Sequence, residues 1–225
     1  SSQDPTSSTP TPQPDQNPPS PVHAIPQLSS VIKAMASAPP TTSAPTSTPA
    51  IPSEAVVKAT DDIYIELTPH DLDSRALTTF VRSPHAGATV LFIGTTRDSF
   101  NNLPVSGLAY TSYTPLAKTT LFNIATAVLE KHKCTKLAIS HKLGDCPVGE
   151  ESIVIAVSAP HRKAAWLAGE EALELTKEKA EIWKLERFEG GEGVWRANRD
   201  GAMGTKVPAE EEKELPRVRS SVRIS

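Results

Sequence analysis

The sequence has few of the residues from which a disulfide framework or a metal site is built. Its two cysteines, Cys134 and Cys146, form no CxxC pair and lack the spacing of a zinc site. No metal or other cofactor is therefore expected. Two isolated thiols fit a reducing compartment, so we expect the protein to be cytoplasmic.

Long apolar runs and a strong net charge are also missing. No segment approaches the roughly 20 apolar residues of a membrane-spanning helix, and the N-terminal region does not resemble a secretory signal or a mitochondrial presequence. The formal net charge is only −3, which gives no indication of binding to nucleic acid or to an anionic membrane. We therefore expect neither as a partner.

Familiar catalytic motifs are absent as well. The sequence contains no GxSxG elbow, no Walker loop, no GxGxxG opening a helix and no HExxH. An enzyme built on this chain must therefore use other groups than those of serine hydrolases, nucleotide-binding enzymes or zinc peptidases.

Proline is abundant instead, with 21 residues, most of them before residue 53. Residues 1–53 consist mainly of Ser, Thr, Pro, Gln and Ala and cannot bury enough apolar surface to offset the entropy of ordering. We predict a disordered tail over 1–53, one compact domain over 54–202 and a charged tail over 203–225.

Apolar periodicity within the central domain predicts the order β-α-β-β-α-β-β-α-β. Strands are expected at 63–67, 87–94, 105–113, 137–143, 152–158 and 182–188, with helices from Thr68-Pro69 to Val81, from Thr114-Pro115 to Lys133 and from Pro160 to Lys179. Two hairpin-like steps argue against a purely parallel sheet. The predicted fold class is α+β, with helices packed on a mixed or antiparallel sheet.

Basic residues stand where these elements end. His161 and Arg162 follow a buried strand and open a helix, whose first turn offers free N–H groups to an anion. Arg97 follows another buried strand. Lys177 and Lys184 flank the junction of the last helix and the last strand, where a lysine beside Trp183 can be partly desolvated and suits proton transfer.

Each of these residues taken alone is at least as often an ordinary surface residue as a functional one. Their joint position predicts a site for a small anionic molecule. His141 is interpreted as a structural residue at a strand end rather than as a base.

An ordered set of segments resembles the large, catalytic subunit of molybdopterin synthase. The matching segments are GATVLFIGTTRD (87–98), YTSYTPLA (110–117), SHKLGDCPVGEESIVIAVSAPHR (140–162), Lys177, IWKLE (182–186) and WRAN (195–198). The sequence departs from the family at Glu181, where many members carry a proline.

The resemblance implies an α/β-hammerhead fold and a dimer of large subunits within a heterotetramer. It also implies a small ubiquitin-like partner whose C-terminal thiocarboxylate supplies sulfur. The substrate would be cyclic pyranopterin monophosphate, which is converted to molybdopterin in molybdenum cofactor biosynthesis. The family's catalytic lysines fall on Lys177 and Lys184. Its substrate-binding positions fall on Arg97, His161, Arg162, Lys177, Lys184, Leu185 and Glu186.

Two alternatives stay open on the sequence alone. One is a non-catalytic scaffold that binds a ubiquitin-like protein, against which the retention of all five basic positions argues. The other is an unrelated phosphate-binding or acyl-transfer enzyme, for which the chain has no nucleophile motif.

Overall fold

The structure is a computed structural model that describes residues 51–189, 193–198 and 205–207. All of them belong to one of the two units into which the chain divides, Thr42–Ser225. The proposed domain boundaries stay predictions, and so do the expectations for the 1–50 segment and the extreme C-terminus, which lie outside the described residues.

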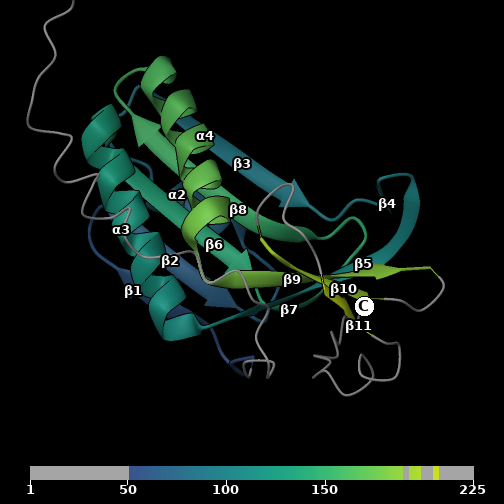
Figure 1. Cartoon of the computed structure of the whole chain (residues 1–225). Coiled ribbons are helices and arrows are strands. Elements are labelled where there is room, and N and C mark those ends of the chain that lie inside the picture. Colours follow the sequence, from purple (N-terminus) through teal and green to yellow (C-terminus); the bar gives the residue numbers. More distant parts are fainter. Residues whose placement is uncertain (1–50, 190–192, 199–204, 208–225) are drawn as a thin grey trace, which may run out of the picture. The chain divides into compact units, whose positions relative to one another are not determined.

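A five-stranded sheet carries most of the core (Figure 1). Its strand order is β1 (Val56–Ala59), β2 (Ile63–Thr68), β6 (Lys136–Lys142), β8 (Glu151–Ala159) and β3 (Ala88–Thr95). β2 and β6 are parallel, and the other neighbours are antiparallel. The sheet is therefore mixed, as predicted.

A second, antiparallel sheet continues from one end of the first (Figure 1). Its order is β11 (Thr205–Val207), β10 (Gly193–Ala197), β9 (Ile182–Phe188), β5 (Leu103–Ser112) and β4 (Ser99–Phe100), and β7 (Gly144–Pro147) also pairs with β5. β11 lies beyond residue 202, inside the segment expected to be a tail.

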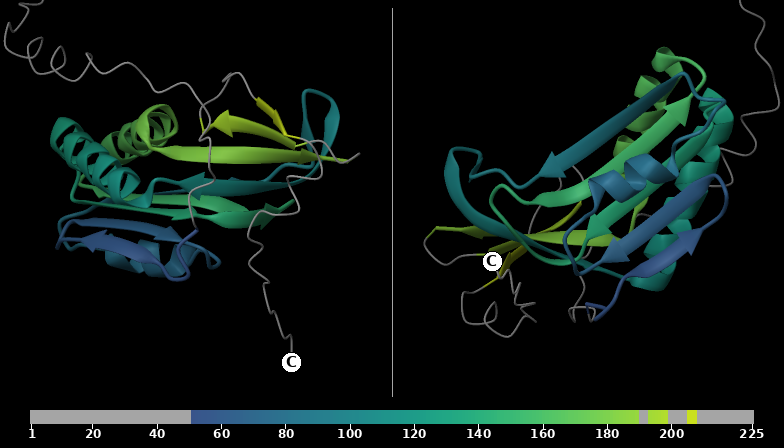
Figure 2. Two further views of the ribbon diagram at one scale, coloured as in Figure 1. Left: turned by 60° about the horizontal axis from the view of Figure 1, so that its bottom comes forward. Right: turned by 180° about the vertical axis from the view of Figure 1, so that it is seen from behind.

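Helices cover both faces of the five-stranded sheet. α3 (Thr114–His132) and α4 (Arg162–Lys179) pack on one face and α2 (Ser74–Phe80) on the other (Figure 2). The central strand β8 is buried on both faces, which explains its continuous run of apolar residues. None of the described helices combines the length and apolarity that crossing a membrane requires.

The six predicted strands and three helices are present, but the starts of all three helices differ from the prediction. α4 begins at Arg162, with His161 at the N-cap, two residues after the predicted Pro160. Thr68 does not cap a helix: it ends β2, and its hydroxyl accepts from the His70 N–H at 3.1 Å. The N-cap of α2 is Asp73, five residues later, whose carboxylate accepts from the Ala76 N–H at 2.8 Å. Thr114 is itself helical, with Tyr113 at the N-cap.

The sequence prediction also missed five short strands, namely β1, β4, β7, β10 and β11. None exceeds five residues, and such lengths give too few alternations for a clear period-two signal. Four of the five belong to the second sheet, which borders the candidate site.

Candidate active site

One cavity of about 430 Å³ opens where the two sheets meet the C-terminal half of α4. Four of the predicted site residues line it: Arg97, Lys177, Lys184 and Glu186. Phe92, Phe100 and Leu173 provide apolar wall, while Asn198 and several hydroxyl groups provide neutral polar wall. The cavity is thus a mostly preformed pocket with a cationic side.

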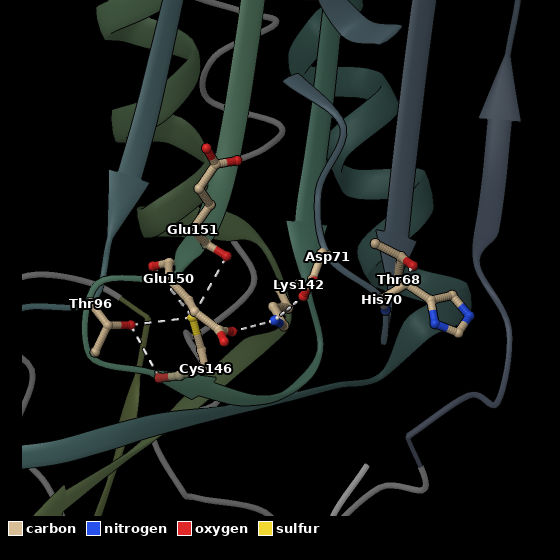
Figure 3. A network of polar contacts seen from close by, with 8 residues as sticks. All are labelled: Thr68, His70, Asp71, Thr96, Lys142, Cys146, Glu150 and Glu151. Atoms are coloured by element: carbon tan, nitrogen blue, oxygen red, sulfur yellow. Dashed lines mark hydrogen bonds and ion pairs between the residues drawn. The ribbon is translucent and has the colours of Figure 1, made fainter. Parts of the chain in front are cut away.

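Arg97 follows β3 and is exposed at the rim of this cavity. The residue before it is buried and well anchored. The Thr96 N–H donates to the Glu150 carbonyl at 3.0 Å, and the Thr96 hydroxyl donates to the Cys146 carbonyl at 3.3 Å (Figure 3). The turn between β7 and β8 therefore fixes the backbone from which Arg97 extends.

A buried ammonium group stabilises that turn. Lys142 Nζ lies 2.8 Å from Asp71 Oδ1 and 2.6 Å from Glu150 Oε2 (Figure 3). Burial by itself would lower the pKa of Lys142, but hydrogen bonds and charge attraction from the two carboxylates raise it overall. Lys142 is therefore a charged structural residue that holds Glu150 in place, and Glu150 in turn holds the backbone next to Arg97.

Neither cysteine is a nucleophile for this cavity. Burial raises the pKa of the Cys146 thiol, and burial likewise raises that of Cys134. Both are free and neither lines the cavity. Among the described residues, no three His, Cys, Asp or Glu side chains are placed to share a metal ion.

Glu186 is held between two cations. Its side chain is 2% exposed, with Oε1 3.2 Å from Lys184 Nζ and Oε2 2.9 Å from Arg196 Nε. The Phe100 ring lies beside both cations, at 5.9 Å from Lys184 Nζ and 5.3 Å from the Arg196 guanidinium carbon. Lys184 is thus fixed by a buried carboxylate and an aromatic face.

The alternation predicted for the last strand is present in β9. Lys184 and Glu186 line the cavity, whereas the side chain of Leu185 is fully buried and is not part of the cavity wall. The structure therefore does not bring the Leu185 side chain to the predicted substrate site.

Lys177 approaches the same cavity from the last turn of α4. The turn that joins it to Lys184 is tied to the start of α3. The Glu181 carbonyl accepts from the Tyr113 N–H at 3.1 Å, and Glu181 Oε1 accepts from the Thr120 hydroxyl at 3.2 Å. Glu181 thereby anchors the turn through its side chain, a contact that the family's proline could not make.

His161 and Arg162 lie at the other end of the helix. They are exposed at the N-terminus of α4, while Lys177 is 15 residues further along it. At 1.5 Å per residue the separation along the axis is about 22 Å. A single chain therefore brings three of the five predicted basic residues to the cavity and leaves His161 and Arg162 apart from it.

Among the residues of the cavity wall that were not predicted as site residues, His141 and Asn198 form a contact with each other. His141, interpreted as structural, is 1% exposed and lines the cavity, where its Nε2 lies 3.1 Å from Asn198 Nδ2. The Tyr110 ring packs edge-on against the imidazole, with centroids 4.9 Å apart, and burial raises the pKa of Tyr110 to about 12. The WRAN segment was noted only as part of the resemblance, and no spacing rule links Asn198 to His141.

An α+β domain with a cationic, preformed pocket is suited to an enzyme acting on a small anionic molecule. Residues 67–179 match the family described as MoaE protein. The chain is 77% identical over 167 residues to the molybdopterin synthase catalytic subunit of Pyrenophora tritici-repentis, a match that covers 74% of this chain and 93% of that protein.

A second relative, the molybdopterin synthase catalytic subunit of Phaeosphaeria nodorum, is 78% identical over 160 residues, covering 71% of this chain and 85% of that protein. Among solved structures, molybdopterin synthase from Staphylococcus aureus matches with a TM-score of 0.57 and 31% identity, covering 62% of this chain and 98% of that one. The chain belongs to the MoaE family, the family of molybdopterin synthase catalytic subunits. The predicted family, fold class and enzyme are confirmed.

Proposed function

We propose that this chain forms the sulfur-transfer site that converts cyclic pyranopterin monophosphate to molybdopterin, using the C-terminal thiocarboxylate of a small ubiquitin-like subunit. The observation that carries this proposal is the convergence of Arg97, Lys177 and Lys184 on one cavity. Both reactants are anionic, so a pocket rich in fixed cations attracts them and offsets their mutual repulsion.

The roles of the residues follow from where they stand. Arg97, exposed at the rim, is placed to meet the incoming tail or an oxygen of the pterin. Lys184 is immobilised by Glu186 and suits charge stabilisation at a fixed point. Lys177, which is partly buried in the last helical turn, is our candidate for the principal acid, base or electrostatic catalyst.

We further propose that His161 and Arg162 act in a second copy of the chain. Their helix start is about 22 Å along the axis from Lys177, too far for a direct contact with that lysine, and neither residue lines the chain's own cavity. Trp166 and Leu167, one turn along the same helix, are 64% and 45% exposed, and exposed large apolar side chains favour an interface. A dimer of large subunits, each with one small subunit, would place the partner's basic pair at a shared substrate site.

Both cysteines are free thiols, which supports the proposal that the reaction takes place in the cytoplasm. The decisive experiment mixes the chain with cyclic pyranopterin monophosphate and a thiocarboxylated small subunit, and follows the pterin by mass spectrometry. The expected product contains two added sulfur atoms. A mixture with carboxylated, sulfur-free small subunit is the control, and unchanged pterin in the thiocarboxylated mixture would overturn the proposal.

A further inference from the structure

His141 and Asn198 form a pair in the cavity wall that the proposed chemistry does not use. His141 stands on β6, and Asn198 directly follows β10, so two different sheets contribute to the pair. Asn198 Nδ2 lies 3.1 Å from His141 Nε2, and the Asn198 backbone N–H donates to the Ile182 carbonyl at 3.1 Å. Both ends of Asn198 are thereby held.

The hydrogen bonds of His141 leave the imidazole one tautomer. Nδ1 lies 2.7 Å from the Lys142 carbonyl oxygen, which can only accept, so Nδ1 must carry the proton. Burial lowers the pKa of His141 to about 4, so the ring is neutral near pH 7. Nε2 is therefore a bare acceptor.

That tautomer in turn orients the amide of Asn198. A bare Nε2 requires a donor, so Asn198 must present its amino group to His141 and not its carbonyl oxygen. Within the described residues this is the one side-chain hydrogen bond that Asn198 makes. Because Asn198 lines the cavity, its carbonyl oxygen and second N–H are left for a ligand.

Apart from His141, Asn198 and several hydroxyl groups, the polar side chains of the cavity are charged. Arg97, Lys177 and Lys184 have no acceptor atom, and the oxygens of Glu186 are engaged by Lys184 and Arg196. These groups suit a phosphate. A pterin ring is neutral and has N–H donors along its lactam edge, which need an acceptor that is not already engaged.

We propose that Asn198, oriented by His141, is a specificity residue that accepts a hydrogen bond from the N–H edge of the pterin ring. The basic residues serve the anionic groups of the reactants, and His141 is a positioning residue that acts through Asn198. This inference rests on the proposed function, since it says how the same cavity recognises the neutral pterin ring of the proposed substrate.

Two probes separate ring recognition from phosphate recognition. Binding of cyclic pyranopterin monophosphate is measured by calorimetry on the full chain in complex with its small subunit, and inorganic phosphate is measured as a competitor. Asn198→Ala is expected to weaken pterin binding about fivefold to tenfold, the effect of one lost hydrogen bond. The affinity for inorganic phosphate, obtained from the competition, is expected to stay unchanged. Arg97→Ala, the matched control, is expected to weaken both.

Steady-state kinetics test the positioning role of His141. In His141→Gln the side-chain oxygen replaces the Nε2 acceptor, so the KM for the pterin is expected to stay within about twofold of the unmodified value. In His141→Leu that acceptor is lost, and KM is expected to rise as in Asn198→Ala, with a smaller change in kcat. Melting curves show which variants fold. If His141→Leu does not fold, the binding measurements on Asn198→Ala test the inference instead.

Three outcomes would overturn the inference: equal losses of pterin and phosphate binding in Asn198→Ala, no loss of either, or an equal rise of KM in His141→Gln and His141→Leu. Failure of the unmodified complex to bind the cyclic pterin at all is a separate result, and it would overturn the proposed function itself.

Discussion

The Nζ of Lys184 lies 3.2 Å from Oε1 of Glu186, a carboxylate that is 2% exposed and also bonded to Arg196. Replacing this charge while keeping its shape tests whether the carboxylate fixes the lysine for the reaction. In Glu186→Gln, two adjacent cations lose their shared counter-ion, so we expect kcat to fall about tenfold or more. The KM for the anionic pterin should not rise, because the pocket becomes more positive. An unchanged kcat in steady-state assays would contradict this role.

Lys177 is expected to be the most sensitive position of the cavity. Lys177→Ala should lower single-turnover product formation by about 100-fold or more, the usual scale of a lost acid-base or electrostatic group. Lys179→Ala is the matched control, since Lys179 is exposed on the same last turn of α4 and does not line the cavity. Comparable activity of the two variants would remove Lys177 from the mechanism.

The proposed sharing of a site between two chains predicts complementation. Arg162→Ala and Lys177→Ala should each be nearly inactive alone. After mixed refolding or co-expression, random pairing makes half of the dimers mixed. Each mixed dimer has one site with an intact Lys177 and a partner's intact Arg162, so activity should recover to about a quarter of the unmodified level. Activity that stays at the level of the single variants would show that Arg162 does not serve a partner's site.

Burial of His141 predicts a pH dependence of stability. An unfolded histidine takes up its proton near pH 6.5, whereas His141 in the folded chain does so only near pH 4. Between these values the unfolded chain binds more protons, so the free energy of unfolding falls as the pH drops from 6.5 to 4. At 1.36 kcal/mol per pH unit the loss amounts to about 3 kcal/mol.

Urea unfolding at pH 7, 5.5 and 4 measures the free energy of unfolding of the unmodified chain and of His141→Gln, and so checks the predicted pH dependence. The variant lacks the titrating ring, so its stability should fall less over the same range, and the difference between the two chains cancels the contribution of other groups. Parallel curves for the two chains would show that His141 does not titrate as its burial requires.

Much of the five-stranded sheet could be predicted from the sequence because its signals are local. The run from Ser152 to Ser158 is apolar on both faces since helices cover both sides of β8. The helix start predicted at Thr68 was wrong because a threonine before a proline is typical of a helix N-cap. In the structure, the Thr68 hydroxyl instead accepts from the His70 N–H and closes a turn. The short strands of the second sheet have too few residues for a clear period-two signal. One of them, β7, pairs with a segment far away in the sequence, β5, and no local pattern reports that pairing.

The same distinction applies to the site. Arg97, Lys177 and Lys184 could be proposed because each stands at the end of an element that the sequence defines. The contribution of Asn198 depends on a contact with His141, which is 57 residues away, and on the hydrogen bond that fixes the histidine tautomer. Such a pair becomes visible only when the register of both sheets is known.

The length of α4 fixes both the distance and the relative orientation of Arg162 at its start and Lys177 near its end. Each residue of an α-helix adds 1.5 Å and turns the following side chains by about 100°. Deleting one residue between Arg162 and Lys177 would therefore shorten the helix by only about 1.5 Å. It would also rotate the Arg162 side chain by about 100° around the helix axis relative to Lys177. Insertions and deletions in this family should consequently be confined to loops and tails, and a change in α4 should be accepted only in whole turns.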